Sequence, residues 1–380
     1  MTNKAVKHHE PLVHIVKRDQ GAITWKSRIL IRAIAIALAL LVSGIMVSVL
    51  ADTDPMKVYK SMISGVFGTE RRRWNAAQGV AMLLCVSLAV TPAFKMKFWN
   101  IGAEGQVLVG GLAATACMVY FGEKVPLVVL YLIMTVASIL AGAIWGLIPA
   151  IFKAKWNTNE TLFTLMMNYV ASGLVAYFLL LWTPSGSSVL GRLDAGHLPV
   201  IGHEFLLLIL LVMLLTGGIF VYQKYTKQGY ELSVVGESEN TAKYIGINVK
   251  TVIIRTMLIS GAICGFAGFL IVGALDHSVA VTSVGGMGFT AIMVSWLAKF
   301  NPLIMIGTSA FITFLDRGAA QITTTFNIDS SFPDMVIGIV LFFVIGCEFF
   351  VSYQLKRKVQ ANTSADPVTE KKSEKGGNEQ

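Results

Sequence analysis

The chain has 380 residues, of which 54% are hydrophobic and only 14% are charged, and its net charge is +9. Soluble proteins carry charge on about 25% of their residues, so this composition excludes an ordinary soluble globular protein. The apolar residues gather in blocks of roughly 20, the length at which a helix crosses a hydrocarbon layer of about 30 Å. Because lipid offers no hydrogen-bond partner to a bare backbone, such blocks are typical of helices. The sequence therefore predicts an all-α fold, a polytopic helical membrane protein.

The two ends of the chain are polar. Residues 1–28 are basic, and we expect them to form an N-terminal tail. The apolar block that follows lacks a small-residue cleavage site, so we expect it to anchor the chain and not to act as a removable signal peptide. Residues 29–355 form the predicted transmembrane domain. Residues 356–380 are rich in Lys, Glu, Ser, Asn and Gly, and are predicted to be a disordered tail.

About ten transmembrane helices are predicted. In chain order the segments are 33–50, 78–94, 105–121, 126–152, 162–182, 205–222, 252–275, 289–297, 302–315 and 333–350. The eighth and ninth are short, and a re-entrant pair is the alternative there. An even number of spans places both termini on one side, and the Lys and Arg of the tails favour the cytoplasm for that side. Residues 54–74 are predicted to form an amphipathic helix at the outer interface.

Several kinds of site are not expected. The cysteines lie in apolar blocks without CxxC spacing, so we expect buried hydrophobes and no metal or disulfide site. They are Cys85, Cys117, Cys264 and Cys347. The glycine-rich stretch 285–288 lacks the lysine and the context of a phosphate loop. The positive net charge is explained by membrane topology and anionic lipid, so no nucleic-acid partner is expected.

A first candidate site is the stretch Asn-Ile-Gly-Ala-Glu-Gly-Gln at the start of the third apolar segment. Its small residues allow close backbone approach, and its amides can close a hydrogen-bonded turn. The residues concerned are Asn100, Gly102, Glu104, Gly105 and Gln106. A carboxylate at membrane depth is costly without a partner, so Glu104 is notable. We expect these residues to serve helix packing and Glu104 to cap its own helix, where the dipole favours an acid, and a direct functional role for Glu104 is the alternative.

A second candidate is Asn168, which lies about two turns into the fifth apolar segment. A buried amide requires hydrogen-bond partners. We expect it either to join two helices or to line a polar passage for a substrate.

The most patterned segment is the loop 223–250, which is too long for a simple turn. A short helix is predicted inside it, begun by Glu237 or Ser238 and ended near Gly246. The residues that define this helix are Gly236, Glu237, Glu239, Ala242, Tyr244 and Gly246. Such a helix suits a groove in a partner protein, or it rests on lipid headgroups. The pattern alone favours neither role.

Four stretches together resemble one family. They are NIGAEGQ at 100–106, NE…TLMMNY at 159–169, GYELSVVGESENTAKYIGINV at 229–249 and SGAICGFAGF at 260–269. In this order they are similar to the permease subunits of bacterial ABC importers of the ribose and branched-chain amino acid superfamily, above all to the nucleoside and simple-sugar branch. The resemblance spans residues 30–350. Ser233 and Thr241 depart from it, because relatives often have arginine and alanine there.

The resemblance implies partners and a location. The loop 229–249 would contain a coupling helix that docks on a cytoplasmic ATPase, and this decides between the two roles above. ATP would be bound by that separate subunit, and no cofactor by this chain. A second permease, commonly non-identical, and an extracellular substrate-binding protein, often a lipoprotein, would complete the importer. The expected location is the bacterial cytoplasmic membrane, with both termini cytoplasmic.

The expected solute is neutral, since no interior Lys or Arg clamp was found for a phosphate or carboxylate. Nucleosides are the first expectation and simple sugars the alternative, both from the resemblance. An ion-coupled secondary transporter is disfavoured, because the acids near the spans lie at the ends of the predicted segments. They include Glu104, Asp276, Asp316, Asp334 and Glu348. A membrane enzyme is disfavoured because no nucleophile–base or metal pattern is present.

Overall fold

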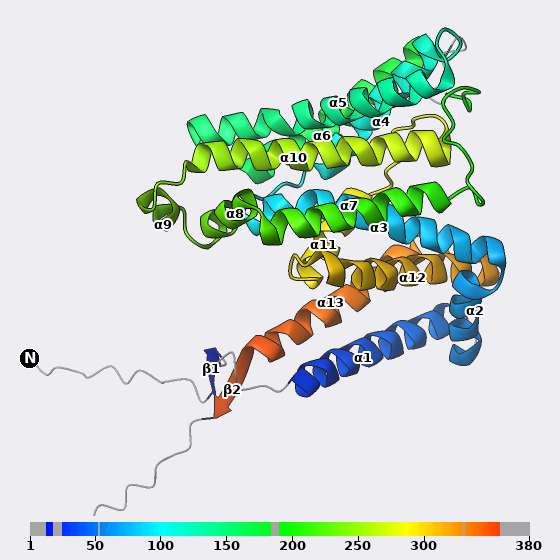
Figure 1. Ribbon diagram of the computed structural model, residues 1–380. Helices are drawn as coiled ribbons and strands as arrows, with labels where there is room; N and C mark the ends of the chain where they lie inside the picture. The colour runs from blue at the N-terminus through cyan, green and yellow to red at the C-terminus, as the bar shows by residue number, and fades with distance from the viewer. Residues whose placement is uncertain (1–12, 18–24, 52–53, 184–189, 330, 358–380) are drawn as a thin grey trace, which may run out of the picture. The chain divides into compact units, whose positions relative to one another are not determined.

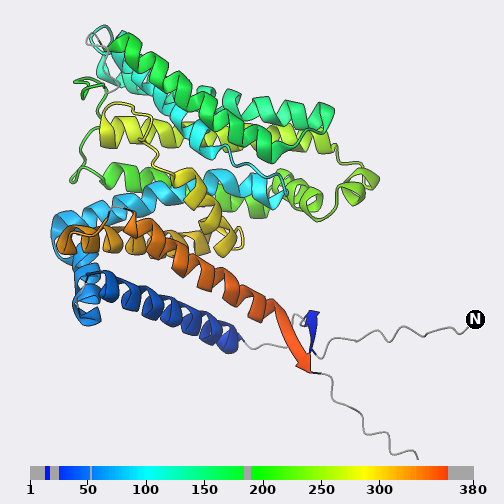
Figure 2. The same cartoon turned by 180° about the vertical axis from the view of Figure 1, so that it is seen from behind.

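The computed structural model describes residues 13–17, 25–51, 54–183, 190–329 and 331–357. The chain divides into two compact units, one made of Met1–Leu41 with Val340–Gln380 and the other of Val42–Ile339. Figures 1 and 2 show the elements from opposite sides. In chain order they are β1 (Val13–Lys17), α1 (Trp25–Ala51), α2 (Pro55–Phe67), α3 (Glu70–Lys95), α4 (Ala103–Phe121), α5 (Leu127–Trp156), α6 (Glu160–Trp182), α7 (Leu206–Tyr225), α8 (Lys227–Glu237), α9 (Glu239–Tyr244), α10 (Val249–Leu270), the π-helix η1 (Ile271–Asp276), α11 (Met287–Leu297), α12 (Pro302–Phe326), α13 (Phe332–Ser352) and β2 (Tyr353–Arg357).

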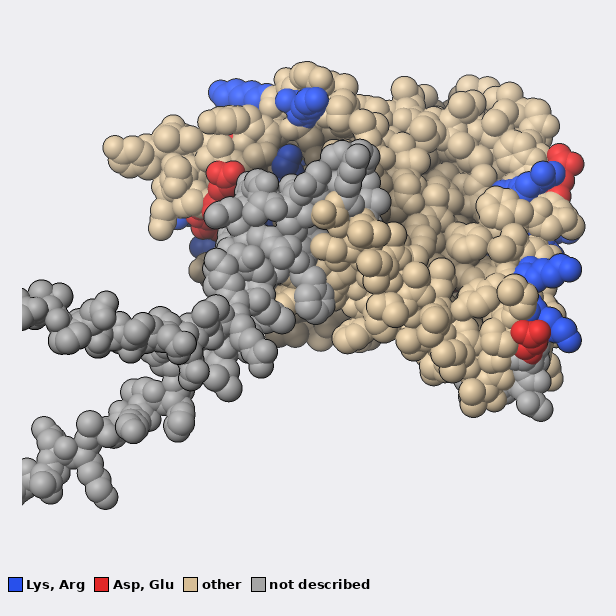
Figure 3. All heavy atoms as spheres, turned by 90° about the horizontal axis from the view of Figure 1, so that it is seen from below, with Lys and Arg blue, Asp and Glu red and all other residues tan. Residues whose placement is uncertain are grey.

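The helical membrane architecture is confirmed. Each predicted apolar segment coincides with a helix, and seven helices of the described chain are long and apolar enough to cross a membrane. On the face shown in Figure 3, charged side chains gather towards the two ends and leave an uncharged band between them. Such a band is what a bilayer requires, because an unpaired charge at the hydrocarbon centre is costly.

The first unit contains a short strand pair that the sequence analysis did not predict. β1 and β2 are antiparallel, with Val13 opposite Arg357. Most of the two predicted tails lies outside the described residues, so the tail assignments stay predictions.

In the second unit, α3 and α10 are the central helices. Of the most apolar stretch of each candidate span, 78% is buried in α3 and 72% in α10 with η1, against 28% in α5 and 22% in α7. Figure 1 shows α10 between α5 and α7. The outer helices therefore offer their apolar side chains to lipid, whereas α3 and α10 are enclosed by protein.

Close backbone packing joins α10 to α5. A Cβ atom on Gly265 of α10 would lie 2.0 Å from the carbonyl oxygen of Ser138 on α5, and one on Gly261 would lie 2.3 Å from that of Gly142. Without a hydrophobic force between helices in lipid, small residues at a four-residue spacing let backbones approach and gain dispersion energy. The stretch SGAICGFAGF at 260–269 is thus the packing surface at the centre of this unit.

The eighth predicted segment is as short as expected, and the ninth is longer. α11 has 11 residues, which at 1.5 Å per residue give about 16 Å, roughly half of the bilayer core. α12 ends at Phe326, so the predicted end at residue 315 was wrong. The charged pair Asp316 and Arg317 weakened the apolar pattern there although the helix continues.

The predicted interfacial helix 54–74 is also shorter than expected. Asp54 caps α2 by accepting a hydrogen bond from the backbone N–H of Met56, and α2 ends at Phe67. Its buried side chains include Met62, which packs against Gly318 of α12. α2 therefore rests on protein, and the three arginines that follow belong to the first turn of α3.

Candidate functional site

The predicted stretch 100–106 forms a hydrogen-bonded turn at the start of α4. Asn100 is fully buried. Its Oδ1 accepts the backbone N–H of Gly102 at 3.1 Å and Nε2 of Gln106 at 3.2 Å. Its Nδ2 donates to Oγ of Ser260 on α10 at 3.3 Å. The turn therefore satisfies its own buried amides and ties the start of α4 to the central helix.

Glu104 has partners that the sequence analysis did not expect. The N-terminus of its own helix has no side-chain cap. Its two carboxylate oxygens instead accept the backbone N–H groups of Gly286 and Gly288, each at 2.8 Å. These groups belong to the first turn of α11, where free N–H donors and the helix dipole favour an anion. Glu104 does lie in the first turn of its own helix, but its hydrogen bonds cap a second helix terminus that the glycine-rich turn brings to it, a partner that the sequence alone did not indicate.

Asn168 is buried between α6 and the start of α4. Its Nδ2 donates to the carbonyl of Ile101 at 2.9 Å, and its Oδ1 accepts the N–H of Gly105 at 2.8 Å. Both ends of the amide are therefore occupied by protein backbone. Of the two expected roles, this geometry fits the joining of two helices, because the buried amide bonds the backbone of the neighbouring helix start through both its oxygen and its nitrogen.

The patterned loop folds into α8 and α9, which lie at one end of the second unit, opposite the start of α3 (Figure 1). Ser238 caps α9, with its Oγ accepting the N–H of Thr241 at 3.2 Å. Ala242 is fully buried in an apolar cluster with Leu232 of α8 and Val249 of α10. The short helix is therefore anchored on its inner side by packing.

α8 is pressed against the end of α3. A Cβ atom on Gly236 would lie 2.1 Å from the carbonyl oxygen of Lys95, so only glycine fits there. Nζ of Lys97 donates to the carbonyl of Glu237 at 3.4 Å. The end of α8 is therefore in direct backbone contact with the end of the central helix α3.

The outer side of this segment is open. The side chain of Tyr244 is 92% exposed, and Glu237, Glu239 and Gly246 are exposed as well. Gly246 has φ of +84°, a left-handed conformation that favours glycine. Of the six predicted coupling residues, Gly236 and Ala242 are buried and serve packing within the chain. The other four present a surface that a partner can contact.

A series of three hollows along α3 was not predicted. The first, of about 600 Å³, is lined among others by Glu70, Arg71, Trp74, Asn75, His203 and Glu204. The second, of about 370 Å³, is lined among others by Asn75, Gln78, Asp276, Ser283, Met287 and Arg317. The third, of about 150 Å³, is lined among others by Leu83, Met287, Thr290, Asp316, Arg317 and Asp334.

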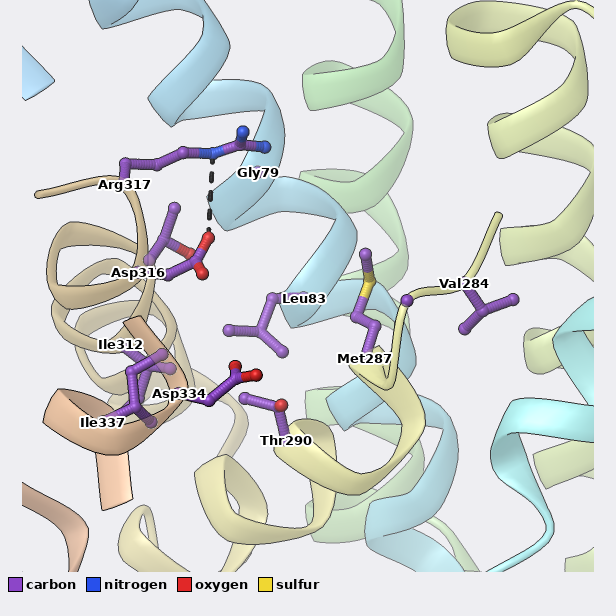
Figure 4. A pocket seen from close by; sticks show the side chains of 12 residues that line it. Gly79, Leu83, Val284, Met287, Thr290, Ile312, Asp316, Arg317, Asp334 and Ile337 are labelled. Atoms are coloured by element: carbon purple, nitrogen blue, oxygen red, sulfur yellow. Dashed lines mark ion pairs between the residues drawn. The ribbon is translucent and has the colours of Figure 1, made fainter. Parts of the chain in front are cut away.

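The third hollow contains three charged side chains (Figure 4). Nε of Arg317 lies 3.9 Å from Oδ2 of Asp316, and each side chain is about half exposed, 46% and 49%. Asp334 of α13 lines the same hollow. Charges inside a membrane domain are expected to face a bundle interior or a water-filled space, so this hollow is a candidate functional site.

Two sequence signals could have pointed to the hollows. Glu70, Trp74 and Gln78 recur at four-residue intervals and mark one face of a helix. Asp316 and Arg317 interrupt an apolar segment that extends beyond them. Neither signal is decisive in the sequence, because residues 54–74 also fit a separate amphipathic helix and the apolar run of the ninth span stops before Asp316.

Comparison with known proteins gives consistent matches. The family model for the branched-chain amino acid transport system permease component matches residues 74–345. The chain is 29% identical to the guanosine ABC transporter permease protein NupP of Bacillus subtilis, a match that covers 87% of this chain and 98% of that protein. It is 27% identical to the glucose ABC transporter permease protein TsgB13 of Haloferax volcanii, over 84% and 87%. It is 23% identical to the nucleoside ABC transporter permease protein NupB of Lactococcus lactis, over 92% and 98%.

Proposed function

The chain belongs to the branched-chain amino acid transport permease family, and from this membership we propose that it is the membrane-spanning subunit of an ATP-driven importer of nucleosides. Its relatives are transport permeases and not enzymes. Membership implies an ATPase and a substrate-binding protein as partners in general terms. The specific partners proposed are a cytoplasmic ATPase that binds the ATP, a second and non-identical permease, and an extracellular binding lipoprotein. No cofactor is proposed for this chain itself.

The nucleoside assignment is supported by relatives named for guanosine and for nucleosides, which match nearly their whole length. A simple sugar is the second candidate, because the relative named for glucose is almost as similar. Both solutes are neutral and rich in hydroxyl groups.

The observation that carries the coupling role is the two-sided character of α9. Ala242 is fully buried and holds the helix on the chain, whereas Tyr244 is 92% exposed on the other side. A short helix that is rigidly seated and presents an aromatic side chain is suited to a groove in a partner. We assign that groove to the ATPase, so that α9 would lie in the cytoplasm. We propose that the chain lies in the bacterial cytoplasmic membrane with both termini on the cytoplasmic side.

One observation favours an ion-coupled transporter as the alternative. Asp316 lies within α12 and not at a span end as the sequence suggested. Membership of the family favours an ATP-driven importer more strongly than this one carboxylate favours ion coupling. The uptake experiment below measures which energy source drives transport.

The experiment is uptake of radiolabelled guanosine and of glucose by native cells, by a deletion strain of this gene and by a complemented strain. We expect guanosine uptake to be lost on deletion and restored by the gene, and to persist when ion gradients are collapsed while ATP is maintained. Loss of glucose uptake alone would support the sugar candidate. Uptake that stops when the gradients collapse, with ATP still present, would contradict an ATP-driven importer.

A further inference from the structure

We propose that the three hollows along α3 form the outward-open half of a solute pathway, and that Asp316 and Asp334 in the third hollow accept hydrogen bonds from the hydroxyl groups of a neutral solute. This inference rests on the proposed importer function and adds to it the residues of the pathway, a gate and a basis for charge selection.

Neighbouring hollows share lining residues, so the three form one series along α3. Asn75 lines the first and the second, and Arg317 lines the second and the third. From Glu70 at the mouth to Leu83 at the innermost point, α3 rises by about 20 Å, which is two thirds of a bilayer core of about 30 Å. The hollows therefore extend well into the membrane domain and are not confined to its surface.

The mouth lies at the end of the unit opposite α9 (Figure 1), which is the extracellular side in the proposed orientation. Trp74 and His203 stack there with ring centroids 3.9 Å apart. This flat pair offers an aromatic surface to a nucleobase or to the apolar face of a sugar.

Beyond the third hollow the path is closed. Ser87 and Thr91 of α3 and Ser295 of α11 are fully buried. Oγ of Ser295 lies 2.9 Å from the carbonyl oxygen of Ser87 and 3.2 Å from Oγ1 of Thr91, within hydrogen-bond distance of both. These bonds hold α3 and α11 together on the side of α9. Within the part of the chain that the structure describes, the series of hollows therefore opens at the start of α3 and is closed towards α9, as one state of an alternating-access cycle requires.

Arg317 and Met287 line both the second and the third hollow, so they stand between the two. The second hollow has a volume of about 370 Å³ and the third about 150 Å³. Small-molecule pockets measure about 300–1,000 Å³, so a whole solute fits the second hollow but not the third. Arg317 and Met287 must therefore move before a solute passes inward, and they act as the gate. The hydroxyl groups of the solute reach Asp316 and Asp334 once this gate has opened.

The path has an excess of acids, which defines the chemical class of the solute. The acids that line it are Glu70, Glu204, Asp276, Asp316 and Asp334, and the bases are Arg71 and Arg317. Ionised carboxylates only accept hydrogen bonds, which suits the hydroxyl donors of a ribose or hexose. A phosphorylated solute would be repelled. The pathway is thus built for a nucleoside or sugar and against a nucleotide or sugar phosphate.

The test is cysteine labelling of the assembled transporter in intact cells with a membrane-impermeant cationic methanethiosulfonate. Gln78→Cys probes the second hollow and Thr290→Cys the third. Ser87→Cys, beyond the closed end, and Leu132→Cys, 67% exposed on the apolar surface of α5, are the matched controls. The native cysteines are buried, so the wild-type chain gives the background. We expect Gln78→Cys and Thr290→Cys to react and the controls to stay at background.

Charge selection is tested on Thr290→Cys with the cationic and an anionic reagent of similar size. We expect the cationic reagent to react at least about fivefold faster, relative to a free thiol in solution, and the ratio to fall when Asp334→Asn is added. Equal relative rates for the two reagents would overturn the charge selection. Absence of labelling at either position, in a chain that reaches the membrane at wild-type level, would overturn the pathway.

Failure of this inference and failure of the proposed function are distinguishable. Labelling reports access of water to the hollows and does not depend on which solute is carried. If guanosine uptake does not depend on this gene while both cysteines react as expected, the nucleoside assignment fails and the pathway stands.

Discussion

The carboxylate of Glu104 on α4 accepts the backbone N–H of Gly286 at 2.8 Å, although the two residues are 182 positions apart. A second bond from Gly288 completes the cap of α11. Through this contact one acidic side chain joins the start of α4 to the glycine-rich turn that borders the third hollow. Any rearrangement of α11 during transport must move or break these two bonds.

Replacing Glu104 with glutamine tests the importance of this cap. The amide retains one acceptor oxygen but turns an NH₂ group towards the second backbone donor, so one buried N–H loses its partner. We expect a loss of about 1–3 kcal/mol in stability and a marked loss of transport. Thermal melting in detergent by size-exclusion chromatography and solute uptake measure the two effects. Glu123→Gln, an exposed acid between α4 and α5, is the control, and equal behaviour of both variants would contradict the role of Glu104.

The close contact between α10 and α5 predicts that the stability of the protein depends steeply on residue size at Gly265. A methyl group there would lie 2.0 Å from the carbonyl oxygen of Ser138, so the helices must separate. We expect Gly265→Ala to destabilise the protein by about 1–3 kcal/mol. Gly173→Ala on α6 meets no atom within 4 Å and should be neutral or slightly stabilising. Thermal melting of both variants measures the difference, and matching melting temperatures would refute the close packing.

Substitutions on the exposed side of α8 and α9 should impair coupling to the ATPase without preventing folding. Tyr244→Ala removes an exposed ring, Glu237→Lys reverses an exposed charge, and Gly246→Pro demands a negative φ where the structure has +84°. We expect all three to abolish or strongly reduce transport while the chain still reaches the membrane. Tyr177→Ala, 59% exposed on α6, should leave transport unchanged. ATPase stimulation and uptake are the measurements, and normal transport by all three variants would rule out docking through this segment.

His277, which follows the last turn of η1, predicts a pH dependence of stability. It is buried, its ring lies 3.8 Å from that of His197, and the carbonyl of His277 accepts the N–H of Leu193. Burial, with the nearby His197 and Arg192, lowers the pKa of His277 from 6.5 to about 4. The unfolded chain therefore binds a proton at His277 between about pH 6.5 and about pH 4 while the folded chain does not.

The stability contributed by neutral His277 is thus fully present above about pH 6.5 and is lost as the pH falls from 6.5 towards 4. Melting temperatures measured across this range should fall more steeply for the wild type than for His277→Gln, which cannot titrate there. Identical slopes for the two proteins would show that His277 is not the group responsible.

Local interactions along the chain determined which segments of this protein form helices. Apolar blocks of about 20 residues specify helices in lipid whatever their partners, because each helix satisfies its own backbone. The short helix at Glu239–Tyr244 was foreseen for a similar reason, since Ser238 and Gly246 act within one turn of it. The order of motifs along the chain was enough to identify the family.

Tertiary structure alone decided which polar groups meet. Glu104 caps α11 and not its own helix, Asn168 binds the backbone of the next motif, and Asp316 lies inside α12 beside a hollow. A sequence states that a buried polar group needs a partner but not which one, because the partner is set by the packing of helices far apart in the chain. Periodicity located the helices of this permease, and only their packing revealed the hollows along α3.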